Sequence, residues 1–224
     1  MVRGPVINRF HAWLHRPEKG WDPVSPSHAR EYGALQWGGD TDPLVDELEA
    51  RLGGLRDKSV LDLGGGPGQY SVAFARRGAT VTWHDVSASY REIAEGRARE
   101  AGVAVELSLG YLEQAPELLG RAFDLVFVRL AWHYCADDRR FAATVHRLVK
   151  PGGAGYVDQD VVESAPVGAR RRMVYALQRS TGIKIGHPRP PSGLIARLLL
   201  EHPVSELALT ATPTNDRIFF RRPA

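Results

Sequence analysis

Cysteine is almost missing from this chain, which has 224 residues and a single thiol at Cys135. One cysteine excludes an internal disulfide, so we expect a protein of the reducing cytoplasm. Long apolar runs are missing too, because no stretch of about eighteen apolar residues is present to form a transmembrane helix. The segment from Met1 to Trp13 lacks the apolar core and the small-residue cleavage site of a secretory signal peptide.

Concentrated charge of one sign is also missing. The chain has 29 Lys and Arg against 26 Asp and Glu, which gives a net charge of +3 at pH 7. Nucleic-acid-binding proteins more often carry a basic stripe, so we expect no nucleic acid as a partner, and without an apolar span we expect no membrane. A hydrophobic share of 43% suffices for one α/β core. We predict a helical, aromatic-rich extension over residues 1–40 and one domain over residues 41–224.

The most informative feature present is a glycine turn. An apolar run with an acid at Asp62 leads into glycines at alternate positions over residues 64–68, and an amphipathic helix follows up to Gly78. Strand, glycine turn and helix in this order leave bare backbone amides near a helix N-terminus, where a nucleotide-like ligand can lie. The dinucleotide pattern G-x-G-x-x-G is absent, because its third glycine position holds Gln69 or Ser71.

A second acid follows at the end of the next β-rich run. Asp85 ends the run over residues 79–84 and lies 23 residues after Asp62. A carboxylate at the tip of a second strand can accept hydrogen bonds from both hydroxyls of a ribose. The alternative is that Asp85 caps the helix predicted near residues 87–101. The position after a glycine turn favours the ribose contact.

The order of predicted elements indicates the fold class. Strand-like and helix-like runs alternate, which predicts a parallel sheet covered by helices on both faces. The predicted strands are 59–63, 79–84, 103–107, 123–129 and 154–161, and the predicted helices between them are 69–77, 88–101, 113–119 and 137–149. A helix capped by Thr41 and ending near Leu52 precedes them. Helices near 166–180 and 192–201 follow, and then β-like runs joined by residues 213–216 that predict a hairpin.

Four landmarks together resemble the class I S-adenosylmethionine-dependent methyltransferases, in their small-molecule branch. These are the acidic-x-G-x-G-x-G turn at 62–68, Asp85, the buried strand at 123–129, and the Leu-x-Lys-Pro-Gly-Gly turn at 148–153. The resemblance covers residues 55–162 well. It implies a doubly wound, mostly parallel seven-stranded sheet with a C-terminal antiparallel hairpin. It also implies S-adenosylmethionine as cofactor and S-adenosylhomocysteine as product.

The resemblance also implies which residues hold the cofactor. The amino acid portion of the cofactor would lie against Asp62 and the turn glycines Gly64, Gly65, Gly66 and Gly68. Asp85 would take the ribose, and Val86 would lie against the adenine. Many relatives carry an acid after the third strand that contacts the adenine amino group. This chain has Tyr111 and Leu112 there instead, and Glu113 is an alternative contact.

Two residues at the end of the fourth strand are candidates for catalysis. An imidazole titrates near neutral pH, so His133 is the best candidate for a base that removes a proton from the acceptor. The alternative is that His133 only packs beside the cofactor. Arg129 lies four residues earlier and could bind the cofactor carboxylate or stabilise a phenolate-like acceptor. An Arg-x-x-x-His arrangement is similar to that of some small-molecule aromatic C-methyltransferases.

The extension and the fifth strand supply the remaining candidates. N-terminal helices in this family often form a lid over the cofactor and shape the acceptor pocket, and Tyr32 is expected to approach the cofactor carboxylate or else to pack against the sheet edge. His11 and His15 share a helix face, which favours a lid helix over a metal site. The expected substrate contacts are His11, Trp13, Trp37 and Asp160, and no metal is predicted, although Asp158 and Asp160 share one side of their strand.

The acceptor is predicted to be a small molecule with a hydroxyl, an amine or an activated ring carbon. Enzymes that methylate base amino groups usually carry an Asp/Asn-Pro-Pro-aromatic turn after the fourth strand, and residues 129–132 read Arg-Leu-Ala-Trp instead. The alternatives are an RNA or protein methyltransferase on the same fold, and a cofactor-binding protein without catalysis. We expect a monomer or a homodimer.

Overall fold

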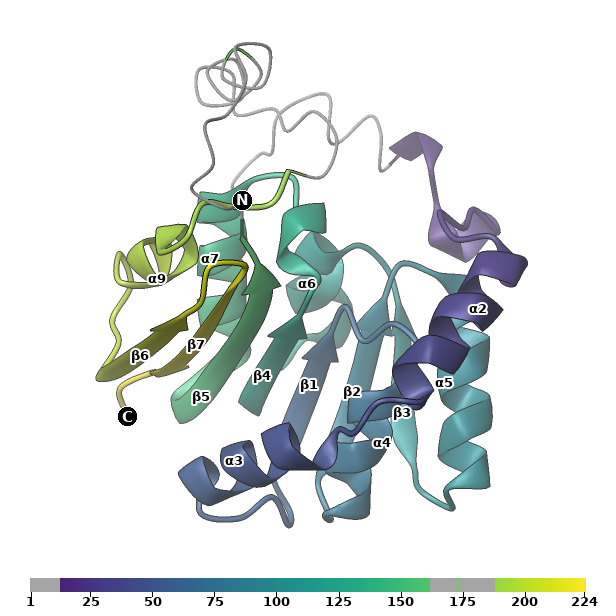
Figure 1. Cartoon of the computed structure of the whole chain (residues 1–224), viewed down its shortest axis with the longest axis horizontal. Coiled ribbons are helices and arrows are strands. Elements are labelled where there is room, and N and C mark those ends of the chain that lie inside the picture. The colour runs from purple at the N-terminus through teal and green to yellow at the C-terminus, as the bar shows by residue number, and fades with distance from the viewer. Residues whose placement is uncertain (1–12, 162–172, 174–187) are drawn as a thin grey trace.

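The computed structural model describes residues 13–161, 173 and 188–224 (Figure 1). Its centre is a seven-stranded sheet with the order β3-β2-β1-β4-β5-β7-β6. Strands β1 to β5 are parallel, and β7 pairs antiparallel with both β5 and β6. The strands are β1 Ser59–Leu63, β2 Thr80–Asp85, β3 Val105–Leu109, β4 Phe123–Arg129, β5 Val149–Asp160, β6 Glu206–Ala211 and β7 Asn215–Arg221. The predicted doubly wound sheet with a C-terminal hairpin is therefore confirmed.

Helices connect the strands and cover both faces of the sheet. The α-helices are α2 Pro26–Trp37, α3 Asp42–Leu52, α4 Gln69–Arg76, α5 Ala88–Glu100, α6 Ala115–Leu119, α7 Asp138–Leu148 and α9 Leu194–Leu199. Short 3-10 helices are η1 Pro17–Lys19, η2 Leu112–Gln114 and η3 Trp132–Tyr134. Figure 1 shows α2 of the extension beside α5, and residues of these two helices are in contact.

The two hydrophobic cores follow from the alternation of side chains along the strands. In β4, Leu125 and Phe127 face a core that includes residues of α3 and α4, such as Leu48 and Phe74. Their neighbours Val126 and Val128 face the opposite core, together with residues of α7 and α9. This two-sided burial explains why β4 has an almost continuous apolar sequence.

Some predictions of local structure need correction, such as β3, which lies at Val105–Leu109 instead of the predicted 103–107. Thr41 occupies the N-cap position of α3, but its side chain makes no capping bond, and the Asp40 carboxylate accepts the Asp42 N–H at 2.9 Å instead. Strand β5 is assigned from Val149, but Gly152 has a φ of +74° and regular pairing with β4 and β7 begins only at Ala154, where the strand was predicted to start. The helix predicted near 166–180 lies almost entirely outside the described residues. Among the residues described here, no helix has the length and apolar character needed to cross a bilayer.

Candidate functional site

The candidate site lies where the carboxyl ends of the parallel strands meet. The strand order reverses between β1 and β4, and ligands of open α/β sheets bind at such a switch point. Asp62 lies near the end of β1, Asp85 ends β2, Arg129 ends β4 and Asp160 ends β5. Four charged side chains thus come from four neighbouring strands to one edge of the sheet.

Three of the four turn glycines are required by close packing. A Cβ atom at these positions would lie within 2.6 Å of a neighbouring side-chain atom. The three contacts are Gly64 with Ala131 at 2.4 Å, Gly65 with Trp83 at 2.3 Å, and Gly68 with Ala94 at 2.6 Å. Gly64 and Gly68 also have φ values of +80° and +83°, which strain any residue with a side chain. The turn is therefore pressed tightly against its surroundings.

Gly66 differs from its neighbours. Its φ is +48°, yet a Cβ atom there would meet nothing within 4 Å. Its N–H donates to Asp85 at 3.0 Å, and its carbonyl accepts from the indole of Trp83 at 2.9 Å. The turn is held by hydrogen bonds at Gly66 but leaves open space beside it, which a ligand can occupy.

Asp62 is a buried carboxyl group, only 3% exposed. It accepts a hydrogen bond of 2.6 Å from the hydroxyl of Ser71, on the first turn of α4. The pKa of Asp62 is raised to about 7, mainly by burial and also by the negative charge of Asp85, although the Ser71 hydrogen bonds and the Arg129 charge lower it. Asp62 therefore titrates near neutral pH in the absence of a ligand.

Asp85 is tied to the backbone of two neighbouring segments. One of its oxygens accepts the Gly66 N–H and the other accepts the Ser87 N–H, both at 3.0 Å. Burial raises the pKa of Asp85, although these backbone hydrogen bonds lower it. Ser87 is the N-cap of α5, since its hydroxyl accepts the Tyr90 N–H, so the alternative role of Asp85 as helix cap is wrong. Val86 follows Asp85 directly and is half-buried.

Tyr111 faces the N-terminal extension. Its hydroxyl donates to the carbonyl of His15 at 2.8 Å, and its ring stacks on Trp21 at 6.0 Å between ring centroids. Leu112 is buried and packs near Gly64. Glu113 accepts the backbone N–H of Ala136 at 2.6 Å, so this interaction ties it to the loop after β4.

His84 is a site residue that the sequence reasoning missed. Its side chain is fully buried, with Nε2 at 3.0 Å from the Tyr111 carbonyl and Nδ1 at 2.9 Å from the Ser108 hydroxyl. A carbonyl can only accept, so Nε2 carries the proton and Nδ1 accepts from Ser108. Burial lowers the pKa of His84, so the neutral ring holds the loop after β3 in place. The sequence signal was weak, a histidine directly before the acid that ends a predicted strand.

Arg129 belongs to a polar network on the other side of the switch point. Its Nε donates to Asp158 at 3.2 Å, and its guanidinium lies 5.1 Å from the ring centroid of Tyr70. Asp158 is buried and also accepts from the side-chain amide of Asn215 at 2.6 Å. Leu130 has a φ of +53°, and its N–H donates to the Asp158 carbonyl at 2.7 Å. The chain thus leaves β4 through a strained residue at this network.

His133 lies on η3, three residues after the strained Leu130. The amide of Gln159 presents its nitrogen at 3.1 Å and its oxygen at 3.4 Å to Nδ1 of the imidazole, and the Tyr134 ring lies 4.0 Å from it. Gln159 is fully buried in β5, and its nitrogen also donates to the Asp160 carbonyl. A buried amide therefore orients the histidine ring, a contact that no sequence pattern indicated.

The structure brings some of the extension candidates to the crevice. The pKa of Tyr32 is raised by burial, is lowered by the positive charge of Arg129, and is raised again by the charges of Asp160 and Asp85. Tyr32 is therefore within electrostatic reach of residues from three strands. Trp37 donates its indole N–H to the Pro67 carbonyl at 2.9 Å, so it contacts the glycine turn. Asp160 pairs with Arg189 at 3.4 Å.

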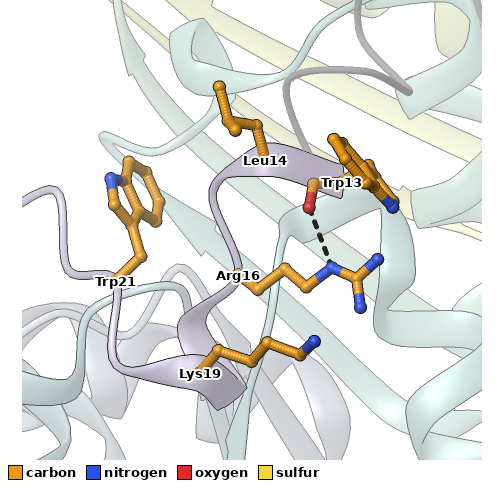
Figure 2. A pocket seen from close by; sticks show the side chains of 5 residues that line it. All are labelled: Trp13, Leu14, Arg16, Lys19 and Trp21. Atoms are coloured by element: carbon orange, nitrogen blue, oxygen red, sulfur yellow. Dashed lines mark hydrogen bonds between the residues drawn. The ribbon is translucent and has the colours of Figure 1, made fainter.

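Trp13 lies elsewhere on the extension. It is 60% exposed, and Figure 2 shows it with Leu14, Arg16, Lys19 and Trp21 around a hollow formed within the N-terminal segment. The Nε of Arg16 donates to the Trp13 carbonyl at 2.8 Å. His11 lies outside the described residues. Within the described part of the chain, no group of three or more His, Cys, Asp or Glu side chains could hold a metal ion.

The fold is that of a Rossmann-like α/β domain, with glycines, carboxyl groups and a histidine gathered around its switch point. Residues 60–153 match the family model described as "Methyltransferase domain". "Ubiquinone biosynthesis O-methyltransferase" of Pseudomonas paraeruginosa is 36% identical over 148 residues, which are 66% of this chain and 59% of that protein. The protein of the same name in Pseudomonas syringae pv. tomato is 35% identical over the same shares. The central part of this chain therefore resembles the methyltransferases in its sequence.

Solved structures agree on the fold. An O-methyltransferase family protein from Burkholderia thailandensis has a TM-score of 0.63 at 19% identity, over 98% of this chain and 71% of the other. The [4+2]-cyclase SpnF has a TM-score of 0.63 at 18% identity, over 82% and 81%. The fold therefore also occurs in a protein named for a different reaction. The chain spans about three fifths of the length of the curated relatives it matches.

Proposed function

We propose that this chain is an S-adenosylmethionine-dependent methyltransferase that acts on a hydroxyl group of a small molecule. The observation that carries the proposal is the meeting of two buried or half-buried carboxylates and an open glycine turn at the switch point, opposite a histidine held by Gln159. The curated relatives named O-methyltransferases support oxygen as the accepting atom.

The residues of the crevice fit this cofactor. Open space beside Gly66 leaves room for it, while Asp62 and Asp85 supply acceptors for its ammonium group and ribose hydroxyls. Gln69, at the start of α4, has a buried side-chain oxygen without a hydrogen-bond partner, which is a further acceptor beside the turn. When bound, the cofactor supplies a methyl group on a positively charged sulfur.

His133 is proposed as the base for the acceptor hydroxyl. A base at Nε2 requires the ring proton on Nδ1, where the side-chain oxygen of Gln159 at 3.4 Å can accept it, and the proton of the hydroxyl would then pass to Nε2. Arg129 is proposed to stabilise the oxygen as negative charge develops on it, with Asp158 fixing the direction of the guanidinium. Asp160 lies beside these groups at the end of β5 and is proposed to contact the acceptor.

The extension is proposed to act as a lid over the cofactor. Three hydrogen bonds fix it to segments around the switch point: Trp37 donates to the Pro67 carbonyl, Tyr111 donates to the His15 carbonyl, and the Ser89 N–H donates to the Asp22 carboxylate at 2.7 Å. They join the extension to the glycine turn, the loop after β3 and the start of α5. A lid held at three points excludes water from the reacting groups when it is closed.

Calorimetry with S-adenosylhomocysteine tests the cofactor, and methyl transfer to a panel of phenols, amines and carboxylic acids tests the acceptor. We expect micromolar binding and turnover with a hydroxylated member of the panel. No binding at millimolar concentration, with uptake of a nicotinamide or flavin instead, would overturn the proposal. Binding without turnover across the panel would favour the non-catalytic alternative, and steeply salt-dependent RNA binding would favour an RNA substrate.

A further inference from the structure

The contact between Asp62 and Ser71 joins the end of β1 to the start of α4. Both side chains are buried, at 3% and 1% exposure, and the hydroxyl of Ser71 donates to one carboxylate oxygen at 2.6 Å. The backbone N–H of Ser71 also interacts favourably with the carboxylate. Gly68 stands at the N-cap position of α4 and has no side chain, so Asp62 serves this helix end from the neighbouring strand.

Among the described residues, Asp62 has no ion-pair partner. Asp85 faces it from β2 and adds negative charge, while Tyr70 of α4 lies close enough to be affected by its charge. Arg129 of β4 is the cation that acts on Asp62, but it is paired with Asp158. A buried carboxylate that lacks a cation is unfavourable in its charged form, and burial accordingly raises its pKa to about 7.

We propose that Ser71 is a positioning residue of the cofactor site, which holds Asp62 ready for the ammonium group of the cofactor, and that binding displaces a proton from Asp62 to solvent. This inference rests on the proposed function. The ammonium group supplies the missing cation, so the Asp62 carboxylic acid loses its proton and the carboxylate remains. Capping of α4 alone would not link the protonation of Asp62 to a ligand.

The direction of the pH dependence follows from this exchange. The ligand binds the charged form of Asp62, so protonation competes with binding below the pKa of the ligand-free protein. Affinity for S-adenosylhomocysteine should therefore fall about tenfold from pH 8 to pH 6, and binding at pH 7 should release about half a proton. Calorimetry in two buffers of different ionisation enthalpy measures both quantities in the full chain.

The Ser71→Ala variant tests the role of the hydroxyl. Loss of a hydrogen bond to the charged form makes Asp62 harder to ionise, so affinity at pH 7 should fall about fivefold while affinity at pH 9 stays within about twofold of wild type. The matched variant Ser71→Thr keeps the hydroxyl and should keep the wild-type pH profile. An unshifted pH profile in a folded Ser71→Ala protein would overturn the inference.

The Asp62→Asn variant keeps the test decisive if Ser71→Ala does not fold. It retains a side-chain oxygen for Ser71 but cannot ionise, so it should bind S-adenosylhomocysteine weakly, without proton release. Wild-type affinity or unchanged proton release in this variant would overturn the inference. If the wild-type protein binds at every pH without releasing protons, the inference fails and the proposed function stands. If it does not bind at any pH, the proposed function fails as well.

Discussion

The two sides of the switch point are built from different kinds of interaction. On the β1–β2 side, carboxylates accept from backbone N–H groups, as Asp85 does from Gly66, and glycines pack against side chains, as Gly64 does against Ala131. On the β4–β5–β7 side, polar side chains hold one another, as in the Arg129–Asp158–Asn215 network and the His133–Gln159 pair. The first side is fixed by backbone geometry, and the second depends on which side chains are present.

This difference suggests which part of the site related proteins can share and which part can differ between them. A backbone-built site requires particular glycines and acids, so it can serve one ligand in many proteins of the family. A side-chain network can be exchanged without altering the sheet, so it can be adapted to different acceptors. Substitutions on the β1–β2 side should therefore change stability and cofactor affinity. Substitutions on the β4–β5–β7 side should change the turnover rate.

The largest expected effect is on folding, at Gly64. Gly64→Ala would place a Cβ atom 2.4 Å from that of Ala131 at a φ of +80°, so we expect the free energy of unfolding to fall by about 3 kcal/mol. Urea denaturation measures this change. Gly66→Ala is the matched control: its Cβ meets open space, so it should lower stability by at most about 1 kcal/mol while weakening cofactor binding. Equal destabilisation by both variants would contradict the distinction between packed and open glycines.

The next effect concerns turnover, at His133. His133→Ala should lower kcat about a hundredfold, because the acceptor hydroxyl loses its base, while affinity for S-adenosylhomocysteine stays within about twofold. Steady-state kinetics and calorimetry measure the two quantities. Gln159→Ala should lower kcat about tenfold, because it leaves the imidazole present but no longer held at Nδ1. A fully active His133→Ala protein would rule out the base and leave the ring a packing role.

The same comparison explains how far the sequence could predict this site. The turn glycines and Asp85 were predictable, because backbone geometry allows few residues there and their spacing is regular along one stretch of chain. Gln159 was not, because its partner His133 lies 26 residues away and one glutamine in a strand gives no pattern. The Asp158 contact with Asn215 spans 57 residues and depends on how the C-terminal hairpin pairs with β5.

The fold shows the same division. The boundaries of β1 and β4 follow directly from their apolar sequences, and both agree with the prediction over residues 59–63 and 123–129. Strand β5 is assigned from Val149, earlier than predicted, but Pro151 and the adjoining glycines mark an irregular stretch, and regular pairing on both sides begins at the predicted Ala154. Local sequence therefore predicted elements well wherever tertiary contacts agreed with it.

The third expected effect is on cofactor affinity, at Asp85, which ends β2. Asp85→Ala removes the acceptors of the Gly66 and Ser87 N–H groups as well as the proposed ribose contact, so affinity for S-adenosylhomocysteine should fall about thirtyfold. Asp85→Asn keeps one acceptor oxygen, so in this variant the affinity should fall only about fivefold to tenfold. Both changes are measured by calorimetry. Unchanged affinity in Asp85→Ala would remove the ribose assignment and limit Asp85 to holding the turn.

The smallest expected effect is on cofactor affinity, at Trp37, where the extension contacts the glycine turn. Trp37→Phe removes the hydrogen bond to Pro67 but keeps an aromatic ring under Arg97, whose guanidinium lies 5.2 Å from the Trp37 ring centroid. One hydrogen bond contributes about 1 kcal/mol, so affinity for S-adenosylhomocysteine should fall about threefold to fivefold. Leu35→Ala on the same helix is the control, because Leu35 is 71% exposed and should leave affinity unchanged. The extension contacts the turn through the hydrogen bond from Trp37 to the Pro67 carbonyl, so only Trp37→Phe should weaken binding. An equal loss of affinity in both variants would indicate that the whole helix is damaged and would contradict a role for this single bond.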